Sequence, residues 1–155
     1  MTIEVKKPAA ERRLGKFQDP DWTAGGERRA VVQLTGLETL WINTGTLCNI
    51  TCRNCYIESS PKNDRLVYIT AAEVAAYLDE IGQQQLATRE IGFTGGEPFL
   101  NPEILTMVGD ALARGLQALV LTNALRPMQR PKIKDGLLAL LAAHGSRLKV
   151  RVSLD

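Results

Sequence analysis

The sequence predicts an α/β fold in which parallel strands alternate with crossover helices. From about residue 37 onward, short apolar runs alternate with segments of helical periodicity in the order βαβαβαβ. Capping residues, glycines and an Asn-Pro pair mark the boundaries between these segments. Repeated units of this kind form parallel strands joined by right-handed crossovers, as in an open doubly wound sheet or a (β/α) barrel.

The size and composition of the chain agree with one globular core. The 155 residues are 45% hydrophobic and 23% charged, and the net charge of +2 gives no indication of a nucleic-acid or membrane partner. No segment approaches the roughly 20 apolar residues that a membrane span needs, and the first residues lack the apolar centre of a secretory signal. We therefore expect a cytoplasmic protein.

Residues 1–36 are expected to form an irregular arm followed by a hairpin. Residues 1–29 mix charged residues with prolines and show no sustained apolar period. The β-rich runs at residues 30–34 and 37–45 flank a Thr-Gly turn signal, which predicts a hairpin or strand pair. This pair leads into a first core strand over residues 39–43.

The next elements are predicted from caps and periodicity. Thr70 and Glu73 form a capping box, and apolar residues recur at helical spacing after it, which predicts a helix over residues 71–86. Residues 90–94 are a short strand. Asn101 and Pro102 predict the start of a helix that ends near residues 114–115.

The remaining elements complete the alternation. An apolar run at residues 118–121 predicts a strand buried on both faces, and a helix is expected over residues 134–143, ending near Gly145. A last strand follows at residues 148–154. Since no helix follows to cover it, we expect this chain to be the N-terminal part of a longer protein.

All three cysteines of the chain, Cys48, Cys52 and Cys55, lie on the loop predicted after the first core strand, with the spacing C-x3-C-x2-C. This odd, crowded set cannot form a disulfide framework, but thiolates are ligands of iron–sulfur clusters and of zinc. Three thiols leave one iron of a cube open, whereas a closed zinc site needs a fourth ligand, which would have to be His144. The spacing favours a cluster, with zinc or three unliganded thiols as alternatives.

Two further sets of residues follow predicted strands. Gly95-Gly96-Glu97-Pro98 comes directly after the second strand, and two glycines allow the backbone to approach a ligand closely. Thr122-Asn123 ends the third strand, and Ser153 lies at the end of the fourth. Active sites of parallel α/β folds gather at the carboxyl ends of the strands, so these residues and the cysteines are expected to meet there.

These motifs resemble those of the radical S-adenosylmethionine (radical SAM) enzymes. The resemblance covers about residues 37–155 and rests on the cysteine triad, Gly-Gly-Glu-Pro, the Leu-Thr-Asn end of the third strand and Val-Ser-Leu-Asp on the fourth. It implies a partial (β/α) barrel with about four parallel strands and crossover helices. Residues 37–155 would then be the N-terminal part of the core domain, incomplete at its C-terminus, preceded by the arm and hairpin of residues 1–36.

The resemblance also implies an activity. Enzymes of this family bind a 4Fe–4S cluster and S-adenosylmethionine and cleave the latter reductively to a 5'-deoxyadenosyl radical, which abstracts hydrogen from the substrate. By this resemblance, the three cysteines hold the cluster, and the amino and carboxylate groups of S-adenosylmethionine chelate its fourth iron. The implied cofactor-binding residues are Asn54, Tyr56, Gly95, Gly96, Glu97, Pro98, Thr122, Asn123 and Ser153.

The sequence departs from the family pattern at one position. The family often places an aromatic residue immediately before the last cysteine, where this chain has Asn54, with Tyr56 after the cysteine. The resemblance therefore implies a backbone contact at Asn54 rather than stacking.

The expected partners are a small-molecule or peptide substrate and an electron donor such as flavodoxin or ferredoxin, with no nucleic acid or membrane. The expected activity is that of an oxidoreductase. A non-catalytic iron–sulfur or zinc module for sensing or electron transfer is the alternative.

Overall fold

The computed structural model describes residues 19–33 and 35–153 and divides the chain into two compact units, Met1–Thr35 and Gly36–Asp155. Residues 1–18 of the predicted arm, residue 34 of the predicted hairpin and the last residue of the predicted fourth strand lie outside the described residues. In the first unit, Trp22 and Arg28 form an isolated antiparallel bridge, and Arg29 Nε donates to Asp19 O at 2.8 Å.

The first strand of the predicted hairpin is not formed at its described residues. Residues 30–33 form no strand, although this segment contains consecutive valines. Preference for β structure depends on a partner strand and a surface to pack on, and a short run of β-branched residues supplies neither. The first core strand, by contrast, occurs at the predicted residues.

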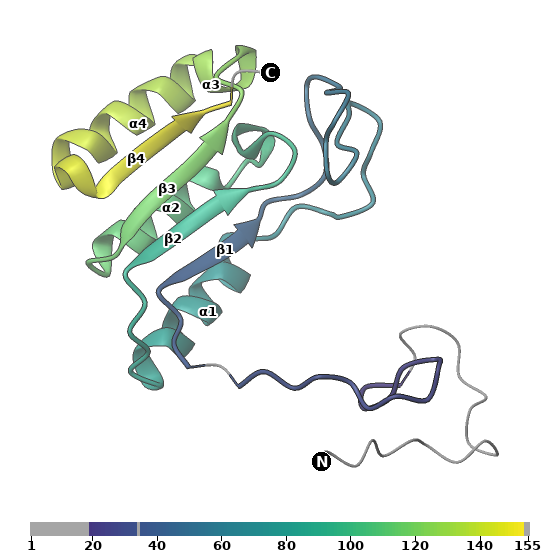
Figure 1. The fold of residues 1–155 in the computed structure, drawn as a ribbon. Helices are drawn as coiled ribbons and strands as arrows, with labels where there is room; N and C mark the ends of the chain where they lie inside the picture. Colours follow the sequence, from purple (N-terminus) through teal and green to yellow (C-terminus); the bar gives the residue numbers. More distant parts are fainter. Residues whose placement is uncertain (1–18, 34, 154–155) are drawn as a thin grey trace. The chain divides into compact units, whose positions relative to one another are not determined.

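The second unit is a four-stranded parallel sheet with the order β1-β2-β3-β4 (Figure 1). The strands are β1 (Thr39–Asn43), β2 (Glu90–Thr94), β3 (Gln117–Thr122) and β4 (Leu148–Val152). Each strand pairs with the next strand along the chain, so the winding never reverses, whereas a doubly wound sheet reverses its strand order at a switch point. This topology is that of a segment of a (β/α) barrel, as the sequence predicts.

The helices α1 (Ala71–Gln83), α2 (Ile104–Ala113) and α4 (Pro131–His144) cover one face of this sheet (Figure 1). Alternate strand residues point toward them and form one buried core with the apolar faces of the helices. Residues fully buried in this core include Ile91, Phe93, Val120, Val108 and Leu112. None of the helices in the described ranges is long and apolar enough to span a membrane.

Helix α1 begins where the capping box predicts but ends at Gln83 rather than Leu86. At its start, Glu73 N donates to Thr70 Oγ1 at 3.2 Å, and Thr70 N donates to the Glu73 carboxylate at 2.8 Å. At its end, Gln85 adopts a φ of +51°, and Leu86 N donates to Ile81 O at 3.0 Å. This is a Schellman motif with glutamine in the position that glycine usually occupies, which is why the sequence does not reveal the end.

Replacing Thr70 with alanine is expected to lower the free energy of unfolding by about 1 kcal/mol, because Glu73 N loses its acceptor. Urea denaturation measures the change, and Thr70→Ser, which keeps the hydroxyl, should retain most of the stability.

The hydrogen bonds from Thr70 also hold the pKa of Glu73 below its usual value. The ionised Glu73 therefore contributes its full share to the free energy of unfolding at pH values above its usual pKa. This share is lost as the pH falls through the lowered pKa. Thr70→Ala should reduce this loss of stability at low pH.

Two helices begin at other residues than the sequence predicts. Helix α2 begins at Ile104 rather than at Pro102, since a 3-10 turn at Pro98–Leu100 precedes it. The predicted cap is present, since Asn101 Oδ1 accepts from Glu103 N at 2.9 Å. The buried Nδ2 of the same side chain donates to Thr44 O at 3.2 Å and to Ile69 O at 2.9 Å. A short helix that the sequence did not predict, α3 (Arg126–Gln129), precedes α4, which begins at Pro131.

Candidate functional site

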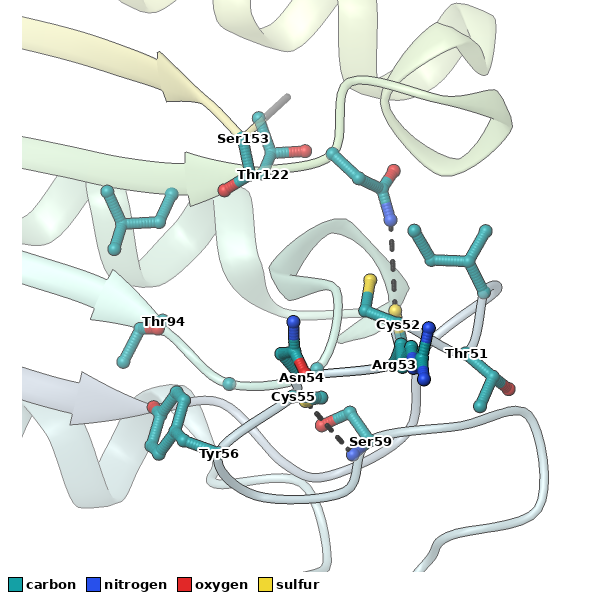
Figure 2. A pocket seen from close by; sticks show the side chains of 16 residues that line it. Thr51, Cys52, Arg53, Asn54, Cys55, Tyr56, Ser59, Thr94, Thr122 and Ser153 are labelled. Carbon is teal, nitrogen blue, oxygen red and sulfur yellow. Dashed lines mark hydrogen bonds between the residues drawn. The ribbon is translucent and has the colours of Figure 1, made fainter. Parts of the chain in front are cut away.

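A cavity of about 750 Å3 opens at the carboxyl ends of the strands (Figure 2). It is bounded by the loop after β1, the glycine turn after β2 and the ends of β3 and β4. The residues that line it are Cys48, Ile50, Thr51, Cys52, Arg53, Asn54, Cys55, Tyr56, Ser59, Thr94, Gly95, Gly96, Leu121, Thr122, Asn123 and Ser153.

The loop that carries the cysteines folds back on itself. Leu47 and Ser60 form a parallel bridge, and Cys48 N donates to Ser60 O at 3.1 Å, which closes the loop at its base. Within it, Cys55 N donates to Cys52 O at 3.4 Å. All three cysteines line the cavity.

The surroundings of Cys55 lower the pKa of its thiol. Partial burial raises its pKa, but hydrogen bonds from the backbone of Ser59, Ile57 and Glu58 outweigh this effect and leave the pKa below its ordinary value. The hydrogen bond from Ser59 N to Cys55 Sγ measures 3.3 Å (Figure 2). Thiolate is the form of cysteine that binds metals, so the local backbone favours the ligating state.

The glycine turn after β2 contacts the cysteine loop directly through the backbone. Gly96 N donates to Gly45 O at 2.8 Å, and Glu97 N donates to Leu47 O at 3.0 Å. Gly95 has a φ of +138°, and a Cβ at Gly96 would lie 2.1 Å from Leu47 O. Only glycine permits this approach, so the two motifs that are far apart in the sequence form one structure.

The carboxylate of Glu97 is 2% exposed and joins this turn to the end of β3. Its Oε1 accepts from Thr122 Oγ1 at 2.8 Å and from Phe99 N at 3.2 Å, and its Oε2 accepts from Asn123 N at 3.0 Å. Both oxygens are thus engaged by protein donors. The side chain acts as a brace between loops and does not face the cavity.

Replacing Glu97 with glutamine should lower the free energy of unfolding by about 1–3 kcal/mol, because an amide nitrogen would face donors that need an acceptor in a buried site. Equilibrium denaturation in urea measures this loss. The matched control is Glu38→Gln, since Glu38 is exposed and its replacement should change stability by less than about 0.5 kcal/mol. Equal stability of the two variants would contradict the bracing role.

The structure brings most of the predicted site residues to one cavity. Asn54, Tyr56, Gly95, Gly96, Thr122, Asn123 and Ser153 line it together with the cysteines. Within the described ranges, Glu97 and Pro98 are buried and are not among the lining residues. Tyr56 is 76% exposed. The role of each residue toward a cofactor stays a prediction.

Several lining residues were not predicted. Thr94 and Leu121 could have been found, because they lie at strand ends next to recognised motifs. Arg53 and Thr51 lie between the cysteines, and Ser59 follows them in a loop without a recognisable pattern. The hydroxyl of Ser59 is buried and has no hydrogen-bond partner in the part of the chain that the structure describes.

The zinc alternative with His144 as fourth ligand is wrong. His144 ends α4, and a 3-10 turn at Gly145–Arg147 connects it to the start of β4, so it lies at the amino ends of the strands. Its Nδ1 lies 3.1 Å from Arg147 Nη2. Over residues 19–33 and 35–153, no three His, Cys, Asp or Glu side chains form a group that could hold a single metal ion. A 4Fe–4S cluster offers a separate iron to each thiolate, so three cysteines around one cavity fit it better than they fit a single ion.

Comparison with known proteins agrees with the geometry. The sequence of residues 42–155 matches the Radical SAM superfamily. The chain belongs to this family. One relative is the GTP 3',8-cyclase of Rhodococcus opacus (strain B4). The two sequences are 32% identical over 157 residues, and the aligned region covers 99% of this chain and 41% of that protein. The chain thus spans 41% of the length of this radical SAM relative.

Solved structures of radical SAM enzymes share the fold. Streptococcus suis SuiB bound to S-adenosylmethionine superimposes with a TM-score of 0.59 at 19% identity, over 77% of this chain and 25% of SuiB. BtrN in complex with AdoMet and 2-DOIA gives a TM-score of 0.52 at 20% identity, over 66% of this chain and 42% of BtrN. These similarities confirm the predicted partial (β/α) barrel.

Proposed function

We propose that this chain forms the part of a radical SAM enzyme that binds a 4Fe–4S cluster and S-adenosylmethionine. The observation that carries the proposal is the direct backbone pairing of the glycine turn with the cysteine loop at one cavity. A cluster held by three thiolates has one open iron, and the turn beside it exposes backbone that could bind the amino-acid part of the cofactor.

Different residues would bind the cluster and S-adenosylmethionine. Cys48, Cys52 and Cys55 would hold the cluster, while Gly95 and Gly96 would contact the methionyl part of the cofactor. When bound, the reduced cluster would supply one electron for cleavage of the cofactor to methionine and a 5'-deoxyadenosyl radical, which takes a hydrogen atom from the substrate. The brace at Glu97 keeps the turn and the end of β3 at fixed positions around this chemistry.

The substrate class that we propose is a small molecule. The relative with 32% identity is a GTP 3',8-cyclase, which supports a small-molecule substrate for this chain, although SuiB is seen with a precursor peptide. An electron donor of the flavodoxin or ferredoxin type, an oxidoreductase reaction and a cytoplasmic location are parts of the same proposal.

Anaerobic reconstitution with iron and sulfide tests the proposal. We expect about four irons per chain and an absorption or EPR spectrum that changes when S-adenosylmethionine is added. One tightly bound zinc per chain would contradict the cluster. A full complement of iron whose spectrum is unaffected by S-adenosylmethionine would favour a non-catalytic cluster module instead.

A further inference from the structure

Asn123 directs its side-chain amide at a cysteine sulfur. Its Nδ2 lies 3.7 Å from Cys48 Sγ and 3.0 Å from Asn49 Oδ1. Its Oδ1 accepts from Leu125 N at 3.0 Å. Because a backbone N–H can only donate, this last contact fixes which end of the amide faces the sulfur: the nitrogen donates to Cys48.

The backbone around Asn123 is held in place from both sides. Asn123 N donates to Glu97 Oε2 at 3.0 Å, and Ala124 N donates to Thr122 Oγ1 at 3.0 Å. Gln129 Nε2 donates to Ala124 O at 3.1 Å. The amide is therefore positioned before any cofactor arrives, and reorienting it would break a hydrogen bond on its other side.

We propose that Asn123 is a positioning residue that raises the reduction potential of the cluster through its hydrogen bond to Cys48. This inference rests on the proposed function, since it requires Cys48 to be a cluster ligand. Reduction adds one negative charge to the cluster and its thiolates, and a donor aimed at a ligating sulfur stabilises the more negative state. Hydrogen bonds to the sulfurs are among the features that set the potential of iron–sulfur clusters.

The test is a redox titration of the reconstituted cluster, followed by EPR, without substrate. Asn123→Ala removes the donor and should lower the equilibrium constant for reduction about tenfold, which corresponds to a midpoint about 59 mV more negative for one electron. Asn123→Asp keeps the shape and the acceptor for Leu125 N but replaces the donor with a charged oxygen, so its shift should be at least as large.

Gln84→Ala is the matched control, because it removes an exposed carboxamide whose nitrogen donates to Glu80 Oε1 and which has no part in the contacts around Asn123. Its midpoint should equal that of the unmodified protein. An unchanged or more positive midpoint in Asn123→Ala and Asn123→Asp would overturn the inference, as would failure of both variants to assemble a cluster, which would assign Asn123 to assembly rather than to tuning. Failure of the unmodified protein to take up iron would instead overturn the proposed function.

Discussion

Replacing Cys52 with alanine is expected to abolish assembly of the cluster and, with it, all reductive cleavage of S-adenosylmethionine. Cys52 is one of the three thiols that line the cavity, and no other cysteine exists in the chain to replace it. Loss of one of three ligands leaves two irons of the cube without protein thiolates. Iron and sulfide content after anaerobic reconstitution, and formation of 5'-deoxyadenosine, measure the effect.

Lys62→Ala is the matched control for this loss. Lys62 lies farther along the same loop and is exposed, so its variant should assemble the cluster at the level of the unmodified protein. Cleavage at a normal rate in Cys52→Ala would contradict the ligand assignment. Normal iron content with no cleavage would show that Cys52 has a different task from holding iron.

Replacing Gly96 with alanine should cause the largest loss of stability among these variants, about 3 kcal/mol or more. The added Cβ would lie 2.1 Å from Leu47 O and 2.8 Å from Thr46 O, and these are backbone atoms that cannot move aside without displacing the cysteine loop. The two loops must then separate, and the hydrogen bond from Glu97 N to Leu47 O is lost with them. Both the midpoint of urea unfolding and the affinity for S-adenosylmethionine should fall.

Gly82→Ala separates this effect from a general sensitivity to alanine. Gly82 lies in α1, and a Cβ there would meet nothing within 4 Å. Because alanine favours helix more than glycine does, this variant should gain about 0.5–1 kcal/mol. If Gly96→Ala were as stable as the unmodified protein, the close packing of the two loops would be contradicted.

The alternation of strands and helices could be predicted because local signals agree with the final contacts. The capping box at Thr70 and Glu73 gives the start of α1, and the Glu90–Thr94 run gives β2 at its observed bounds. These signals depend on neighbouring residues only, so they need no knowledge of the rest of the fold.

The errors arise where distant contacts decide. Asn101 accepts from Glu103 N as its cap signature predicts, but regular helix α2 begins only at Ile104. The amide nitrogen of Asn101 also binds the carbonyl oxygens of Thr44 and Ile69, and no local pattern reveals these contacts. The end of α1 depends on a left-handed glutamine, Gln85, which composition does not reveal. In the site, the cysteines and glycines could be identified from their motifs, whereas the inward-turned carboxylate of Glu97 and the neighbours of Asn123 depend on the folded chain.

The junction between the glycine turn and the cysteine loop is made of main-chain atoms: the N–H groups of Gly96 and Glu97 and the carbonyl oxygens of Gly45 and Leu47. Every amino acid carries a carbonyl group, so a substitution at Leu47 leaves the bonding atoms of the junction in place. During divergence, the side chain of Leu47 could therefore change while the two loops stayed in register. The steric limits on substitution fall on glycines of both loops: Gly45 has a φ of +127°, and a single added methyl group at Gly96 would push the loops apart.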